Sequence, residues 1–314
     1  MSLLRPVLAI LVVAVACAVS MAFSEHHAGS NEKPFDLLYA HVVPAVLVSE
    51  EAHEDHSHAE ALVAIPLPES LGFFGHPAHD GKLVATNLQI FQVASVLLVL
   101  IIFSGIPGYL RTGRGDALSR VGAGFCLWIR DEMVVPVMGK EMGGKFLPYF
   151  LSVFFFILFA NLMGLVPGSA TATASIWVTG GLALTTFVAM LGCGMAVQGP
   201  VAFWKNLVPH VPAWLWPLML VVELMGLLVK PAALMIRLFA NLTGGHLVVL
   251  SFMGLIFFFA GTEFSAAGGY GIAPVAVGFA VFIMIIEGFV ALLQAYIFTQ
   301  LSILFVHASV HPEH

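Results

Sequence analysis

Charged side chains are scarce in this chain. Only 10% of its 314 residues are Asp, Glu, Lys or Arg, whereas soluble globular domains average about 25%. Hydrophobic residues make up 60% of the chain, and the mean hydropathy is +0.98. This composition excludes a water-soluble globule and indicates an integral membrane protein.

Other scarcities exclude further classes of protein. The three cysteines, Cys17, Cys126 and Cys193, form no C-x-x-C motif and no paired pattern, which argues against a disulfide framework or a cysteine metal site. The net charge is −6, and no basic patch suggests binding to nucleic acid. The long runs of Phe, Leu, Val and Ile do not alternate with polar residues as transmembrane β-strands do. We therefore expect α-helices.

The N-terminal segment, residues 1–23, resembles a secretory signal, because Arg5 is followed by an unbroken apolar stretch and then by small residues. Cleavage at residues 18–22 would remove this segment, and a retained first transmembrane helix is the alternative. Residues 24–84 form an acidic, His-rich tail without sustained periodicity, which we expect to be irregular and external. Histidine-rich tracts can bind metals, but a solvated tail is the simpler interpretation of residues 53–58.

The membrane domain is expected to cover residues 85–314. Three of its segments, residues 88–110, 146–166 and 175–197, have the roughly 20 apolar residues that a spanning helix needs. The connection between the first two holds half of the basic residues of the chain, which are Arg111, Arg114, Arg120, Arg130, Lys140 and Lys145. The positive-inside rule therefore places this connection in the cytoplasm and the N-terminal tail outside. Within it, residues 121–138 mix apolar and charged side chains as an interfacial helix does.

Two further apolar segments are longer than a membrane is thick. Residues 218–260 would form a helix of roughly 64 Å, and residues 272–307 one of roughly 54 Å, against a hydrocarbon core of about 30 Å. Either these helices break, at Pro231 or at Gly244-Gly245, or they lie strongly tilted. We favour two long tilted helices that form a hairpin through an external loop at residues 261–271. The expected fold class is an all-α polytopic membrane protein with about five membrane helices, an interfacial helix and a cytoplasmic C-terminus.

Ionisable residues inside the long segments are candidate functional residues, since each costs about 2.5 to 3.5 kcal/mol near the bilayer centre. At 100° per residue, Lys230 lies within about 20° of Arg237, and Glu223 lies within about 40°. One polar stripe is therefore expected along one helix. Arg237 stays protonated, so it can fix a positive charge but cannot relay a proton. Two structural readings stay open: Lys230 beside Pro231 can snorkel from a helix end, and Glu223 can pair with Lys230 as a bridge.

A second set of polar residues is expected on other faces. His246 lies nine residues after Arg237, about 180° round the helix, and so faces a different neighbour. Glu287 and Gln294 are seven residues apart and share a face of the last helix, with Tyr296 on another face. In an antiparallel hairpin, His246 and Glu287 approach each other near the external end, as a water-lined proton path would need. A satisfied core histidine is the structural alternative for His246.

Three motifs resemble subunit a of the rotary F-type ATP synthase. They are E-L-M-G-L-L-V-K-P at residues 223–231, R-L-F-A-N at residues 237–241 followed by Gly245-His246, and L-Q-A-Y-I-F at residues 293–298. The stretch N-L-M-G-L-V-P at residues 161–167 is also similar to that family. The likeness covers roughly residues 85–314 and leaves out the His-rich tail.

The resemblance implies a function and a site. It implies a proton-conducting stator subunit, not an enzyme by itself, with two offset half-channels that couple proton flow to rotation of a ring of c subunits and to ATP synthesis. The matching residues are Arg237 for the stator arginine that faces the c-ring carboxylate, Glu223 for the cytoplasmic half-channel, and Asn241, His246, Glu287 and Gln294 for the external half-channel. The implied partners are the c-ring, the b-subunit peripheral stalk, the rest of the complex and the bilayer of a bacterial inner membrane. No cofactor, metal ion or nucleic acid is implied.

The sequence departs from many bacterial members of that family at two positions. Those members have a carboxylate at the position of His246 and a histidine at the position of Glu287. Here the two are exchanged, as in mitochondrial relatives, and the exchange keeps one acid and one imidazole. Many members also carry an aspartate where Gly164 stands, so no proton role is implied for that position.

Two other functions would also use buried charges. A secondary proton-coupled transporter is the alternative, but such folds commonly contain internal repeats with matched broken helices, and the two halves of this sequence show no repeat. A membrane scaffold, in which charges merely pair helices, would tolerate a neutral substitution of Arg237 once its partner was also removed.

Overall fold

A computed structural model describes residues 4–23, 64–66, 82–84, 86–166, 173, 175–207, 212, 214–261 and 265–311 of the chain. Most of the His-rich tail, including residues 53–58, lies outside these ranges. Within them, the strands β1 (Ala64–Pro66) and β2 (Lys82–Val84) pair antiparallel. The tail that was predicted to be irregular therefore contains one short strand pairing.

Helices make up nearly all of the rest of the described chain. They are α1 (Leu4–Phe23), α3 (Asn87–Phe103), α4 (Ile106–Thr112), α5 (Ala117–Trp128), the π-helix η3 (Ile129–Val134), α6 (Val135–Gly164), α7 (Ile176–Gln198), α8 (Pro200–Asn206), α9 (Trp216–Gly261) and α10 (Ser265–Val310). By length and composition, six helical stretches of the described residues could cross a membrane. Five correspond to the predicted spans, and the sixth is α1. The prediction of an all-α polytopic membrane protein is confirmed.

The connection predicted to hold an interfacial helix is helical from Ala117 onward. The helix α5 leads through η3 into α6, and Gly139 then interrupts the helical geometry with φ 73° and ψ 170°. A positive φ of this size is accessible to glycine and strained for other residues. The kink therefore falls directly after the predicted segment at residues 121–138 and seven residues before the second predicted span at residues 146–166.

The two over-long segments form a hairpin of unbroken helices. Each of α9 and α10 has 46 residues, or roughly 69 Å of helix, so each crosses a hydrocarbon core of about 30 Å only when strongly tilted. Pro231 and Gly244-Gly245 lie inside α9 without ending it. The predicted loop at residues 261–271 is too long, because α10 already begins at Ser265.

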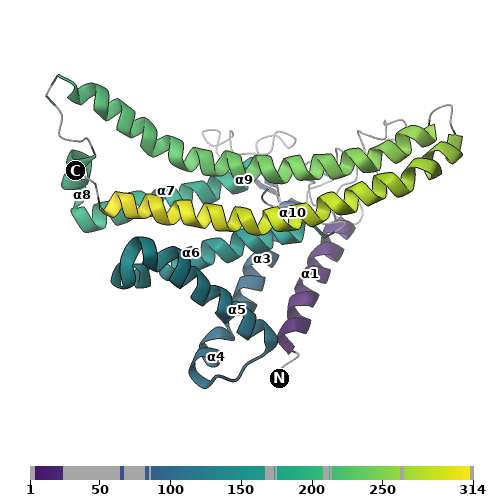
Figure 1. Ribbon diagram of the computed structural model, residues 1–314, viewed down its shortest axis with the longest axis horizontal. Helices are drawn as coiled ribbons and strands as arrows, with labels where there is room; N and C mark the ends of the chain where they lie inside the picture. The colour runs from purple at the N-terminus through teal and green to yellow at the C-terminus, as the bar shows by residue number, and fades with distance from the viewer. Residues whose placement is uncertain are drawn as a thin grey trace.

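The hairpin lies along the longest axis of the molecule (Figure 1). The helices α9 and α10 run side by side, α6 and α7 pack against α10, and α1 packs against α3 on the side away from α9. The main buried cluster is formed by aromatic and aliphatic residues of η3, α6, α9 and α10, among them Phe150, Phe154, Met133, Leu238 and Ile303. This packing holds α10 between α6 and α9, and so fixes where the polar residues of the hairpin point.

Candidate functional site

The polar stripe of α9 lies on a largely open face, and its Lys230 end also reaches Phe305 of α10. Lys230, Arg237 and Asn241 are exposed, whereas Leu234 and Leu238 are at most 2% exposed. The two sets alternate at helical spacing, so α9 turns its leucines toward the bundle and its polar side chains outward. The prediction that Lys230 and Arg237 share one face agrees with this arrangement.

Arg237 has no acidic partner within the described part of the chain. Four ion pairs occur there, and none involves its guanidinium. An unpaired cation in a membrane-spanning helix is costly unless it meets water or an opposite charge. The open face of α9 therefore leaves room for water or an opposite charge at the level of Arg237.

Glu223 and Lys230 do not form the structural bridge that the sequence left open. Glu223 is half-buried, and no ion pair joins the two side chains in the described residues. Lys230 instead places its Nζ atom 5.8 Å from the ring centroid of Phe305 on α10, which is a cation–π contact. Glu223 is thus left on the stripe side of α9 without a cationic partner among these residues.

His246 and Glu287 meet inside the hairpin, as the antiparallel arrangement predicted. The His246 Nε2 and Glu287 Oε1 atoms are 3.8 Å apart, and the Glu287 side chain is only 5% exposed. This distance suits an ion pair but is too long for a hydrogen bond. His246 faces α10 while Arg237 faces outward, in agreement with the predicted half turn between them.

Gly245 makes this approach possible. A Cβ atom at position 245 would lie 2.7 Å from Glu287 Oε1 and 2.9 Å from Glu287 Cδ. Real Cβ atoms do not come so close to other atoms, so any larger residue would push the carboxyl group away from α9. The glycine therefore lets a buried carboxyl group lie directly against the backbone next to His246.

Gln294 continues the buried polar face of α10. It is 5% exposed, like Glu287 one heptad before it, so the shared face predicted from their spacing is observed. Tyr296 lies on a different face and is partly exposed, with its ring 5.8 Å from the ring of Trp128. Asn241 is not part of the buried set, because it is exposed on the Arg237 face.

Asn161 belongs with the buried polar residues, although it was not predicted as a site residue. Its Nδ2 atom donates a hydrogen bond of 3.4 Å to the backbone oxygen of Ala291, one helical turn after Glu287. Its Oδ1 atom accepts a hydrogen bond of 2.7 Å from Thr173 Oγ1. The signal in the sequence was an amide side chain within an otherwise apolar span. Buried polar groups nearly always have a hydrogen-bond partner, so such a side chain marks a specific contact.

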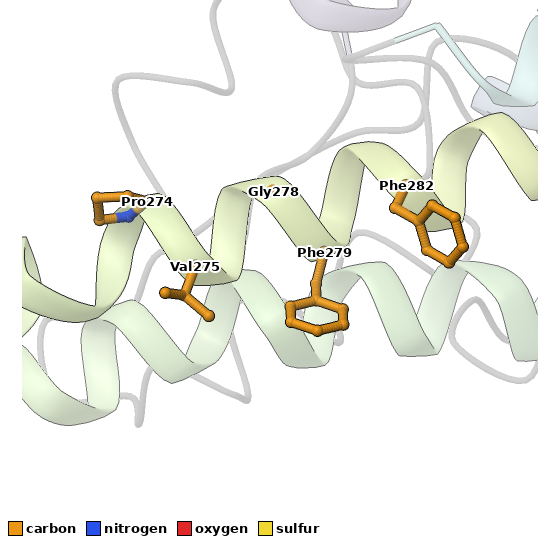
Figure 2. A pocket seen from close by; sticks show the side chains of 5 residues that line it. All are labelled: Pro274, Val275, Gly278, Phe279 and Phe282. Carbon is orange, nitrogen blue, oxygen red and sulfur yellow. The ribbon is translucent and has the colours of Figure 1, made fainter.

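Two grooves on the described surface are apolar and lie apart from these polar residues. The larger, of about 470 Å³, is lined by Pro274, Val275, Gly278, Phe279 and Phe282 of α10, and Figure 2 shows these side chains along one stretch of the helix. The second, of about 350 Å³, lies between α5 and α10. Neither lining contains a carboxyl group, an imidazole, an amine or a thiol, and the phenol of Tyr296 is the titratable group of the second groove.

The arrangement places proton-exchanging groups on one side of α9 and a permanent positive charge on the opposite side. An imidazole and a carboxyl group, both able to exchange protons, lie together inside the hairpin, while a permanent cation lies on the outer face of α9. Such an arrangement can carry protons part of the way across the membrane and present a fixed charge to a neighbouring molecule.

Comparison with known proteins gives a family match and several similar proteins. The family described as ATP synthase A chain matches residues 89–307 of the chain. ATP synthase subunit a of Chloroherpeton thalassium is 38% identical over 268 residues, which cover 84% of this chain and 76% of that protein. ATP synthase subunit a 2 of Chlorobium luteolum is 34% identical over 309 residues, which cover 96% of this chain and 84% of that protein.

A further relative matches over a shorter stretch. ATP synthase subunit a of Myxococcus xanthus is 45% identical over 188 residues, which cover 60% of this chain and 59% of that protein. The chain thus spans about three fifths of the length of the Myxococcus protein. The match with the family begins after the His-rich tail, as the sequence motifs predicted.

Proposed function

The chain belongs to the family of ATP synthase A chains, and on that premise we propose that it is the proton-conducting stator of an F-type ATP synthase. It is not an enzyme by itself. It couples proton flow through two offset half-channels to rotation of a ring of c subunits, and the b-subunit peripheral stalk and the rest of the complex are its other partners. The alternative of a secondary proton-coupled transporter finds no support in the family match.

The external half-channel is assigned to the polar residues inside the hairpin. His246 and Glu287 exchange protons with water, and Gln294 extends the polar surface toward the level of Arg237. Asn161 positions α10 at this point through its contact with Ala291. Asn241 lies on the exposed face beside Arg237, where its amide can hydrogen-bond the water that passes the proton to the c-ring.

Arg237 is assigned to the boundary between the half-channels. Its guanidinium is exposed, unpaired within the described residues and always protonated. A carboxylate of a passing c subunit supplies the missing negative charge. The fixed cation holds that carboxylate ionised as it passes, so the carboxylate gives up its proton before it passes and takes one up afterwards.

The cytoplasmic half-channel is assigned to Glu223. It precedes Arg237 by fourteen residues, or about 21 Å along the helix. A protonated c-subunit carboxyl group avoids most of the cost of crossing lipid, so the ring can carry it almost a full turn from one half-channel to the other. A membrane potential of 100 mV contributes about 2.3 kcal/mol for each proton moved.

The proposed orientation has an external N-terminal tail and a cytoplasmic C-terminus. Arg5, at the start of α1, donates a hydrogen bond of 3.0 Å to Ser119 and lies 3.9 Å from Asp116. Both partners belong to the Arg-rich connection that the positive-inside rule assigns to the cytoplasm. The end of α1 that leads into the tail is therefore directed to the opposite side of a bacterial inner membrane.

One observation carries the proposal most directly: Arg237 is exposed and unpaired on one face of α9, and the His246–Glu287 pair lies behind it. The test is purification of the chain from native membranes, followed by ATP-driven acidification of inverted vesicles. Co-purification with a c-ring and acidification that stops when Arg237 is replaced by Ala are expected. A chain that purifies without a c-ring and transports a solute with protons would contradict the proposal.

A further inference from the structure

Two contacts fix how α9 and α10 face each other along the hairpin. Near the external end, His246 lies 3.8 Å from Glu287. Toward the other end, Lys230 Nζ lies 5.8 Å from the ring centroid of Phe305. The two helices therefore keep one antiparallel register over the stretch that contains the stripe.

The interior at the level of Arg237 is apolar. Arg237 is about halfway between Lys230 and His246, so its level on α10 falls at residues 295–298. The residues that fill this level belong to one buried cluster and are each at most 3% exposed. They are Phe154 and Ile157 of α6, Leu234 and Leu238 of α9, and Ala295 and Phe298 of α10, and we call them the apolar layer.

Buried polar residues lie on both sides of this layer along α6. On the outer side, Asn161 contacts the backbone of Ala291 on α10. On the inner side, the Tyr149 hydroxyl donates to Thr186 Oγ1 of α7 at 3.3 Å, and Thr186 Oγ1 is 3.3 Å from the Oγ atom of Ser302 on α10. The layer's two α6 residues come between Tyr149 and Asn161 in the chain.

The same alternation occurs along α10. Phe298 lies on the buried face four residues after Gln294 and four residues before Ser302, all three being at most 5% exposed. Gln294 and Ser302 are thus about 12 Å apart along the helix, and Phe298 is halfway between them in the chain on the same buried face. A side chain without donor or acceptor atoms interrupts any chain of hydrogen bonds at that point.

Each polar cluster keeps unused hydrogen-bonding capacity. Among the described residues, Glu287 Oε1 on the outer side and Thr299 Oγ1 at the inner edge of the layer, directly after Phe298 in the chain, are buried and make no hydrogen bond. Buried polar atoms of this kind are where internal water binds in proteins. Water on both sides would leave the apolar layer as the barrier between two proton-accessible regions.

We propose that the apolar layer is a proton seal, with Phe298 at its centre, that prevents the two polar clusters from joining into a path straight through the subunit. The proposal rests on the proposed stator function and adds a second barrier to it. Arg237 closes the direct route on the exposed face of α9, and Phe298 closes the route behind it. Hydrophobic constrictions block ions in membrane pores by excluding water in the same way.

The test uses vesicles that contain the whole complex, with rotation stopped by a hydrophobic carbodiimide that modifies membrane carboxyl groups. Wild-type vesicles should then be tight to protons driven inward by a potassium diffusion potential. Phe298→Ser should show a proton leak at least several-fold above that background, because its hydroxyl offers a hydrogen-bonding site within the layer. Phe298→Leu, which stays apolar, is the matched control and should remain tight.

A second variant with a smaller change in volume separates a proton leak from a folding defect of Phe298→Ser. Ala295→Ser adds one hydroxyl to the same layer with little change in volume, and it should also leak after carbodiimide treatment. Co-purification of each variant with the c-ring verifies assembly. Assembled Phe298→Ser and Ala295→Ser complexes that are both as tight as wild type would overturn the seal, whereas failure of the wild-type complex to pump would count against the stator function instead.

Discussion

Gly245 of α9 lies directly against the carboxyl group of Glu287 on α10. The space for a Cβ atom at position 245 is already taken by Glu287, with Oε1 only 2.7 Å from where that atom would be. The position of a buried carboxyl group in the proposed external half-channel therefore depends on the absence of a side chain on the facing helix.

Gly245→Ala should displace Glu287 while leaving the helix intact. A shift of about 1 Å in a functional group can lower a rate by up to about 100-fold, so we expect ATP-driven proton pumping to fall by about 10-fold or more. Pumping is measured as acidification of inverted vesicles, at equal amounts of assembled complex. Gly192→Ala on α7 is the control, because a Cβ there meets nothing within 4 Å. Equal pumping by both variants would argue against the close packing of Glu287.

Exchange of His246 and Glu287 should be tolerated better than removal of either. The two side chains lie 3.8 Å apart, so the double variant His246→Glu with Glu287→His returns one acid and one imidazole to the same place. Each alanine variant instead leaves one exchangeable group without the other. Growth on a non-fermentable carbon source and vesicle acidification both report the difference. Equal damage in all three variants would speak against a shared proton path.

Asn161→Leu should slow proton pumping without preventing assembly. The substitution keeps the approximate shape of the side chain but removes the contacts with Thr173 and with the Ala291 backbone. Leaving such buried groups unsatisfied costs about 1 to 3 kcal/mol. We expect a several-fold loss of pumping that Asn161→Gln partly restores, because the longer amide can still donate. Full activity of the leucine variant would show that Asn161 does not position α10.

The position of the hairpin residues could be predicted from the sequence because helix periodicity is rigid. Helix periodicity places Arg237 and His246 on opposite faces of one helix, and Glu287 and Gln294 on the same face of the next. An antiparallel hairpin then allows few arrangements in which the two helices face each other. The length of the apolar segments at residues 218–260 and 272–307 likewise predicted a hairpin of two long helices, which α9 and α10 form.

Other features depend on contacts that no single segment specifies. Pro231 could have ended α9, but the helix continues through it. The kink at Gly139 arises from the positive φ angle of one residue. Several other glycines of the chain lie inside regular helices, so the presence of a glycine does not predict a kink. Spacing offered Lys230 a bridge to Glu223 or a snorkelling position at a helix end, and only the packing of α10 brought Phe305 to it. The placement of Asn161 against Ala291 required knowledge of how α6 and α10 pack.

ATP-driven acidification of inverted vesicles from an Arg237→Ala strain tests the stator proposal most directly. Arg237 is the fixed cation on the open face of α9. Acidification should fall to background, and Arg237→Lys should also be severely defective because the planar, always charged group is lost. Lys230→Ala, on the same face, should retain most of the activity. Normal acidification by the Arg237→Ala vesicles would contradict the mechanism.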